Sequence, residues 1–157
     1  LKAAAERYDP VTGVWSSAGT MVGARASHVT ARLPDGRVLA AGGWAAGITV
    51  ETSTLYDPAT NAWTAGPSML VPRQRATSVA LLDGDVLVFG GVTGTGINRS
   101  VERFDHRSGT FRPAGELLVG RQAHLSLDFA HEVSCCGMAV AVTSFTCMGD
   151  SSATSLS

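Results

Sequence analysis

Three arginines recur in this sequence at a fixed distance from one another. Arg25, Arg73 and Arg121 are each separated from the next by 48 residues. A guanidinium group carries its N–H donors in a planar fork, so a ring of such groups could bind carboxylates through paired hydrogen bonds. The alternative is that each arginine braces its own loop or pairs with an acidic residue nearby. The elements that position these arginines decide between the two roles.

The rest of the chain keeps the same 48-residue phase. A repeat period in the 40s with glycine and aromatic residues at fixed positions is typical of β-propellers, in which each repeat supplies one four-stranded blade. The aromatic positions are Tyr8-Asp9 with Trp15, Tyr56-Asp57 with Trp63, and Phe104-Asp105 with Phe111. The glycine positions are Asp35-Gly36 with Asp83-Gly84, and Gly42-Gly43 with Gly90-Gly91.

Each repeat contains four short runs of β-branched and aromatic residues between turn signals, and these runs predict strands. Asp83-Gly84 predicts a tight hairpin between the first two strands, because glycine adopts positive φ at no steric cost. Asp57-Pro58 opens a second turn, in which Asn61 is expected to take the left-handed conformation. A single meander of this size cannot bury its apolar faces, so it must stack against similar neighbours. In the middle repeat the predicted strands cover 74–82, 85–89, 99–105 and 110–114.

These residues resemble the kelch repeat over about residues 5 to 129. The resemblance rests on Arg73 before the first strand, the run from Val86 to Gly91, the Glu102 to Asp105 segment and the closing aromatic Phe111. It implies an all-β fold of the kelch β-propeller type. In that family each repeat forms one blade, with the first strand innermost and the fourth outermost.

Counting strands predicts about 2.5 to 3 four-stranded blades. Complete propellers usually have four to eight blades, so we expect an arc of a larger propeller that needs further blades or self-association to complete it. The repeat is lost after Ala130, where a tail rich in Cys, Ser and Thr begins; this tail could be native, degenerate or out of frame. The predicted divisions are outer strands of an incomplete blade in 1–17, blades in 18–66 and 67–114, the start of a further blade in 115–130, and the tail in 131–157.

The loops between the second and third strands are the places where binding specificity is expected. Residues 44–50 and 92–98 differ between copies, while the residues around them repeat. Variable loops on a rigid scaffold commonly carry recognition. Together with the usual role of the kelch family, this pattern predicts a non-enzymatic module that binds a protein or carbohydrate (glycan) partner through these loops and the loops between blades. The candidate binding residues are Arg25, Arg73, Arg121, Trp44 and Asn98.

Two other functional readings remain open. The first is a fragment of a kelch-propeller enzyme, of the sialic acid epimerase or galactose-oxidase-like kind. A copper radical site needs a constellation of Tyr, Cys and His, whereas Tyr8 and Tyr56, the only tyrosines, belong to the repeat turn. We identify no catalytic set and predict no cofactor. The second reading is a truncated remnant without independent function.

Composition argues against several partners. The formal net charge is −1 with acidic and basic residues interspersed, which gives no general attraction for nucleic acid. Cys135, Cys136 and Cys147 match no common zinc spacing, so no metal site is predicted. The apolar part of the tail is shorter than the roughly 20 residues that a membrane helix needs, so no membrane span is predicted.

Overall fold

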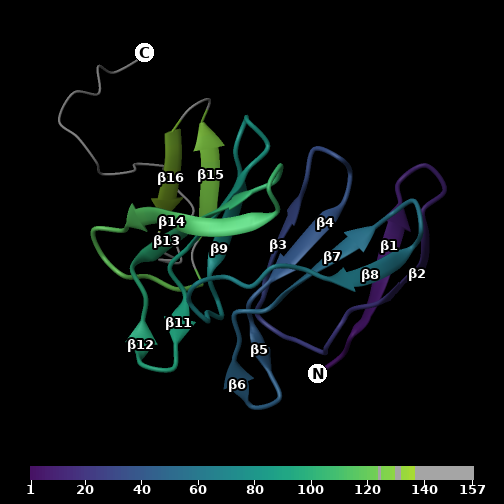
Figure 1. Ribbon diagram of the computed structural model, residues 1–157. Coiled ribbons are helices and arrows are strands. Elements are labelled where there is room, and N and C mark those ends of the chain that lie inside the picture. The colour runs from purple at the N-terminus through teal and green to yellow at the C-terminus, as the bar shows by residue number, and fades with distance from the viewer. Residues whose placement is uncertain (124, 130–131, 137–157) are drawn as a thin grey trace.

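The computed structural model describes residues 1–123, 125–129 and 132–136, and every regular element in these ranges is a β-strand (Figure 1). All of the strands pair in antiparallel fashion. Within these ranges no helix is long and apolar enough to cross a membrane. The all-β prediction is therefore confirmed.

The first complete blade is a four-stranded meander with the order β3-β4-β7-β8. Its register places Val38 opposite Tyr56, and Tyr56 opposite Trp63. The turn between the last two strands follows its sequence signals, since Asn61 adopts a φ of 55° and Asp57 Oδ1 accepts a hydrogen bond from the backbone N–H of Ala59. The strands are β3 (Val29–Arg32), β4 (Val38–Ala41), β7 (Ser53–Asp57) and β8 (Ala62–Ala65).

The second complete blade repeats this design with the order β9-β10-β13-β14. Its register is equivalent, with Val86 opposite Phe104 and Phe104 opposite Phe111. The strands are β9 (Thr77–Ala80), β10 (Val86–Phe89), β13 (Ser100–Asp105) and β14 (Thr110–Glu116). These four strands lie within or close to the ranges predicted from the sequence.

The connection between the second and third strands of each complete blade forms a small hairpin, which was predicted only as a loop. In the first blade Ala46 and Gly47 both have positive φ, 49° and 88°, which is the geometry of a two-residue hairpin turn. Both hairpins project from the same end of the blades (Figure 1). They are β5 (Trp44–Ala45) with β6 (Ile48–Thr49), and β11 (Val92–Thr93) with β12 (Gly96–Ile97).

A two-stranded half-blade lies at each end of the pair of complete blades (Figure 1). β1 (Ala4–Asp9) and β2 (Val14–Thr20) carry the repeat positions of third and fourth strands. β15 (Leu125–Phe129) and β16 (Glu132–Cys136) lie where a further blade would have its first and second strands. β16 falls in the segment predicted to lie outside the repeat. The predicted divisions of the chain remain predictions, and His131 and Cys147 lie outside the described residues.

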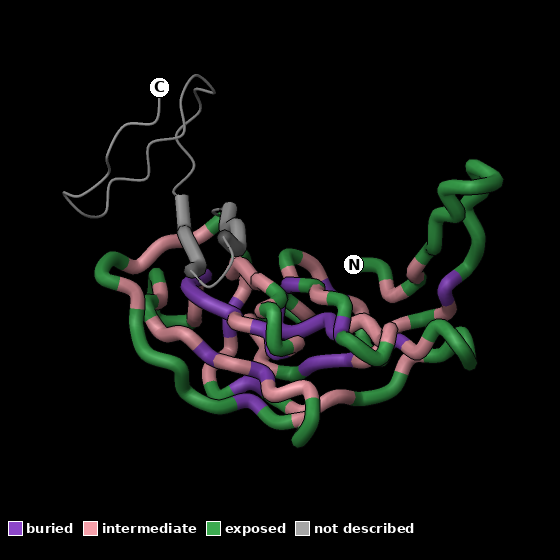
Figure 2. The backbone as a smooth tube through the Cα atoms, turned by 90° about the horizontal axis from the view of Figure 1, so that it is seen from above, coloured by how far each residue is buried: buried purple, intermediate pink, exposed green. Residues whose placement is uncertain are grey.

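The apolar core spans the two complete blades. The first strands of successive blades, β3, β9 and β15, lie side by side, as do the outer strands β2 and β8. Trp63 links neighbouring blades by donating from Nε1 to the carbonyl oxygen of Ala18 at 2.8 Å. Figure 2 shows the buried positions concentrated in the complete blades, while the N-terminal half-blade is mostly exposed. The core cluster consists of Val29, Leu33, Leu39, Ala41, Met69, Val86, Val88, Phe104 and Phe111.

Candidate functional site

Arg25 and Arg73 are buried where the chain enters the first strand of each blade. Their exposed fractions are 6% and 1%. Arg25 Nη1 donates to the carbonyl oxygens of Gly42 at 3.0 Å and Thr52 at 2.7 Å. Arg73 Nη1 makes the equivalent bonds to Gly90 at 3.2 Å and Ser100 at 2.8 Å. The two guanidinium groups therefore brace the second-to-third-strand connection of their own blades.

Arg73 has an acidic partner inside its blade. Its Nη2 lies 2.7 Å from Glu102 Oε1, and both side chains are almost completely buried. The Glu102 carboxylate also accepts the backbone N–H groups of Leu70 and Val71 at 2.7 and 3.0 Å. A buried ion pair requires such additional hydrogen bonds to offset the desolvation of both charges. Glu102 thus fixes the loop that connects the two complete blades.

The first blade lacks this acidic partner. Thr54 stands at the repeat position of Glu102, and its Oγ1 is buried without a hydrogen-bond partner among the described residues. Burial lowers the pKa of Arg25, whereas for Arg73 burial lowers the pKa and Glu102 partly opposes that effect. The two blades therefore share a backbone design, but only the second blade has a buried carboxylate beside its arginine.

Backbone hydrogen bonds join successive blades around the propeller axis. Ser27, Arg75 and Ala123 occupy the same repeat position and all have positive φ, between 49° and 55°. The N–H of Arg75 donates to the carbonyl oxygen of Ser27, and the N–H of Ala123 donates to that of Arg75, both at 2.9 Å. Positive φ is uncommon for residues with a side chain. This backbone ladder therefore holds the inter-blade loops, each of which leads into the first strand of a blade, in a defined conformation.

A groove of about 310 Å³ opens between these loops and the second hairpin. We call it the loop-face groove, and its lining residues are Gln74, Arg75, Val92, Gly96, Ile97 and Gln122. Arg75 and Ile97 are exposed, so the groove presents a cationic and an apolar side chain to solvent. It lies on the face that the sequence predicted for binding, where the hairpins and inter-blade loops meet.

Two amide side chains supply the polar part of the loop-face groove. Gln74 Nε2 donates to Thr49 Oγ1 at 3.0 Å, which connects the groove to the hairpin of the neighbouring blade. Gln122 Oε1 is buried and has no hydrogen-bond partner among the described residues. A buried polar atom without a partner is costly. A ligand group that donates a hydrogen bond would satisfy Gln122 Oε1.

The other predicted binding residues do not line this groove, although Asn98 and Arg121 adjoin the lining residues Ile97 and Gln122 in the chain. Trp44 is exposed on β5, and its backbone pairs with Ala26. Asn98 stabilises its own loop, because Oδ1 accepts the N–H of Ser100 and Nδ2 donates to Ser100 Oγ, both at 3.0 Å. The backbone carbonyl of Arg121 accepts a hydrogen bond from Gly91 at 2.8 Å, and its Nε contacts the carbonyl oxygen of Val119.

Sequence reasoning missed the three polar residues of the groove. Gln74, Arg75 and Gln122 lie one or two positions after the repeated arginines. The signal that could have found them is a break in the repeat, because position 27 is Ser, 75 is Arg and 123 is Ala. A position that varies inside a repeating loop has no shared structural requirement for its side chain.

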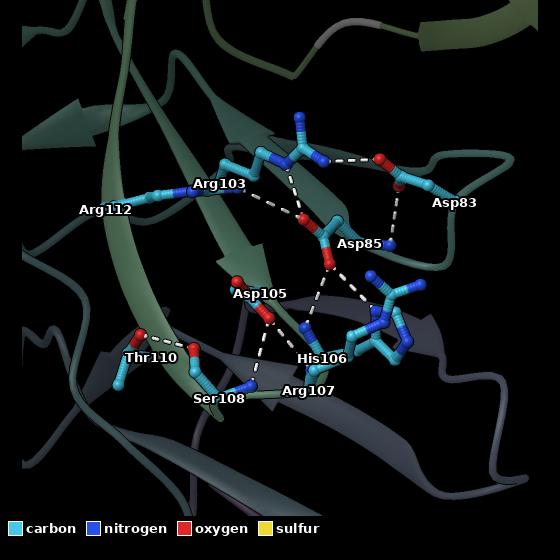
Figure 3. Close-up of polar contacts among 9 residues, drawn as sticks. All are labelled: Asp83, Asp85, Arg103, Asp105, His106, Arg107, Ser108, Thr110 and Arg112. Carbon is cyan, nitrogen blue, oxygen red and sulfur yellow. Dashed lines mark hydrogen bonds and ion pairs between the residues drawn. The ribbon is translucent and has the colours of Figure 1, made fainter.

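A second polar cluster lies at the opposite end of the second blade, where its two tight turns meet (Figure 3). The nearly buried carboxylate of Asp85 accepts a hydrogen bond from Arg103 Nε at 2.5 Å. Its other oxygen meets the backbone N–H and Nδ1 of His106 at 3.0 and 2.8 Å. Arg103 also pairs with Asp83. The first blade has Arg37 and Pro58 where this blade has Asp85 and His106.

The contacts within this turn cluster account for its charged side chains by a structural role. Burial by itself would raise the pKa of Asp85, but hydrogen bonds from His106 and Arg103 lower it to about 2. Asp85 therefore acts as an ionised anchor that joins the first-to-second-strand turn to the third-to-fourth-strand turn. Across the described part of the chain, no group of three or more His, Cys, Asp or Glu side chains could hold a metal ion.

Four-stranded meanders stacked side by side, with buried arginines and paired glycines at matched positions, define kelch-type β-propeller blades. Residues 75–118 match the family described as Kelch motif, so this segment carries a kelch repeat. No curated protein sequence matches the chain.

Among solved structures, the chain is similar to the structure of YjhT, a kelch-type propeller protein. The two superpose with a TM-score of 0.67 at 17% sequence identity, over 76% of this chain and 47% of that one. This likeness confirms the fold. The chain spans about half the length of that structure.

Proposed function

We propose that this kelch-repeat chain is a binding module that recognises a protein or glycan partner at the loop-face groove. The observation that carries the proposal is the position of Arg75. Its backbone is fixed in a positive-φ conformation by hydrogen bonds to the loops on both sides. Its side chain is exposed beside a groove of about 310 Å³. A cation on a rigid backbone loses less conformational freedom when it binds a ligand.

The groove chemistry favours a partner with an acidic group. Arg75 suits a carboxylate, which it can bind through charge-assisted hydrogen bonds. Val92 and Ile97 offer apolar contact beside it, and Gln122 Oε1 offers an acceptor. An acidic peptide segment and an acidic sugar both combine these features. The buried Arg25 and Arg73 brace the loops of their own blades. Asn98 and Arg121 are chain neighbours of the groove residues Ile97 and Gln122, and Trp44 is exposed on the first hairpin.

The test begins with the purified 157-residue chain on peptide and glycan arrays that include acidic members. The strongest ligand is then titrated by calorimetry against the wild type and Arg75→Ala. A hydrogen bond to a charged group contributes about 1.5–3 kcal/mol, so we expect the variant to bind roughly 10- to 100-fold more weakly.

The matched control is Arg37→Ala. Arg37 is a partly exposed arginine that follows the Asp35-Gly36 turn, away from the groove, and it pairs with Asp35 at 2.7 Å. We expect this variant to bind the ligand as the wild type does. Unchanged affinity in Arg75→Ala, or an equal loss in both variants, contradicts a site at the loop-face groove.

A further inference from the structure

Each complete blade meets the inter-blade loop that follows it through the same backbone contacts. The registers of the two small hairpins are equivalent, so Ile97 holds in the second hairpin the place that Thr49 holds in the first. Gly43 and Gly91 donate matching backbone hydrogen bonds to the loop that follows each blade, both at 2.8 Å. A side chain at a given position of that loop therefore faces the same position of the hairpin in both blades.

A glutamine occupies the same position in both loops, and its hydrogen bonding differs between them. Gln74 and Gln122 hold equivalent places in the repeat. Gln74 Nε2 donates to Thr49 Oγ1 at 3.0 Å, so the first hairpin itself satisfies this amide. The residue that faces Gln122 is Ile97, which has no hydroxyl group, and Gln122 Oε1 is buried without a hydrogen-bond partner among the described residues. The exchange of threonine for isoleucine leaves the second amide open.

The open amide shares the loop-face groove with a cation and an apolar side chain. Gln122, Arg75 and Ile97 all line this groove, and Ile97 is 58% exposed. Its volume of about 310 Å³ lies at the lower end of the range of about 300–1,000 Å³ for small-molecule sites. A hydroxyl group can donate to an amide oxygen or accept from an amide nitrogen, so it suits either orientation of the Gln122 amide. The groove therefore fits one ring-sized group that carries both a carboxylate and a hydroxyl.

We propose that the loop-face groove is selective for a sugar acid, and that a ligand hydroxyl gives Gln122 the contact that Thr49 gives Gln74. This inference rests on the proposed function, because it names the ligand class of the same site. Arg75 binds the carboxylate through charge-assisted hydrogen bonds, and Gln122 Oε1 accepts the hydroxyl hydrogen. Ile97 contacts the C–H groups of the ring and keeps the site open, because it cannot satisfy Gln122 itself.

Three small carboxylates test the ligand class when each is titrated into the 157-residue chain and followed by amide NMR shifts. D-glucuronate carries a ring, a carboxylate and hydroxyl groups. Tetrahydropyran carboxylate has the same ring and carboxylate without hydroxyl groups, and acetylaspartate amide offers a carboxylate with peptide N–H donors. We expect glucuronate to bind roughly 3- to 10-fold more tightly than tetrahydropyran carboxylate, because one neutral hydrogen bond separates them at Gln122. The side-chain amide signals of Gln122 should shift with glucuronate.

Two substitutions of Ile97 test the role of the open amide. Ile97→Thr introduces the hydroxyl that the first hairpin already has, so the chain itself should satisfy Gln122. Ile97→Val is the matched control, because valine has the shape of threonine without the hydroxyl. Both changes fall on an exposed side chain and should leave the fold intact. We expect the affinity for glucuronate to be roughly 3- to 10-fold lower in Ile97→Thr than in Ile97→Val.

Several results would overturn this inference. They are equal affinities of Ile97→Thr and Ile97→Val for glucuronate, and glucuronate that binds no more tightly than tetrahydropyran carboxylate or does not bind at all. Tighter binding of acetylaspartate amide than of glucuronate would also overturn it, and would assign the groove to a peptide. None of these results contradicts the proposed function, which fails instead when Arg75→Ala and Arg37→Ala bind the array-selected ligand equally well.

Discussion

Buried arginines at the start of both complete blades donate hydrogen bonds to the main chain. Arg25 and Arg73 make matching bonds to carbonyl oxygens 17 and 27 residues further along. The repeat spacing predicted that they share one role, and the sequence left open whether that role was binding or bracing. Burial favours bracing, because the two arginines are only 6% and 1% exposed and their Nη1 atoms already donate to main-chain carbonyl oxygens. Burial depends on how loops fold over the side chain, which the spacing does not specify.

The Arg73–Glu102 pair gives the first prediction at this scale. Glu102→Ala leaves a buried guanidinium group without its carboxylate and removes the acceptor for Leu70 and Val71. We expect the free energy of unfolding to fall by about 3–5 kcal/mol, measured by urea denaturation. Glu116→Ala removes an exposed partner 3.6 Å from Arg99 and should cost less than about 1 kcal/mol. Equal losses in the two variants would contradict this account of the buried pair.

Asp85 gives a prediction about pH. Its pKa is lowered from 3.8 to about 2 in the folded chain, so its stabilising effect is present above about pH 4 and is lost as the pH falls toward 2. At about 1.4 kcal/mol per pKa unit, Asp85→Asn should reduce the free energy of unfolding at pH 7 by about 2 kcal/mol. The difference between wild type and variant should shrink between pH 4 and 2. A difference that stays constant over this range would show that ionisation of Asp85 is not the cause.

At the scale of elements, the strands and tight turns were readable from the sequence because each depends on local chemistry. Asn61 takes the left-handed turn position that the pattern assigned to it, and Gly109 takes the same position one repeat later. The hairpins β5–β6 and β11–β12 were missed as strands because each strand has only two residues. Runs that short carry no periodicity. The loop-face groove was missed for a different reason, since its residues come from two inter-blade loops and a hairpin that the fold alone brings together.

The paired glycines allow these elements to pack closely, and substituting one of them tests this role. A Cβ at Gly91 would lie 2.6 Å from the carbonyl oxygen of Gln74, and its φ is 88°. Gly91→Ala should therefore lower the free energy of unfolding by more than the roughly 1–2 kcal/mol that a left-handed residue costs alone. Gly94→Ala is the control, because nothing lies within 4 Å of its added Cβ. If thermal melts of the two variants coincide, Gly91 is not required for close approach between the second hairpin and the inter-blade loop.

At the scale of the whole molecule, the described residues form two complete kelch-type blades, with a two-stranded sheet on either side of them. Strand counting predicted about 2.5 to 3 blades because each strand type has its own repeat signature, but it placed β16 outside the repeat, where that signature is lost. The sequence could not predict which surfaces remain exposed, since that depends on what lies against the half-blades.

The central claim about function is that a partner binds at the loop-face groove. Hydrogen exchange with a bound ligand tests this claim most directly. The ligand selected on the arrays is added to the wild-type chain, and exchange is compared with and without it. We expect protection in residues 72–76 and 92–98, which contain five of the six residues that line the loop-face groove, and no change in the turns at 33–37 and 81–85. Protection confined to those turns, with none at the groove, would contradict the account.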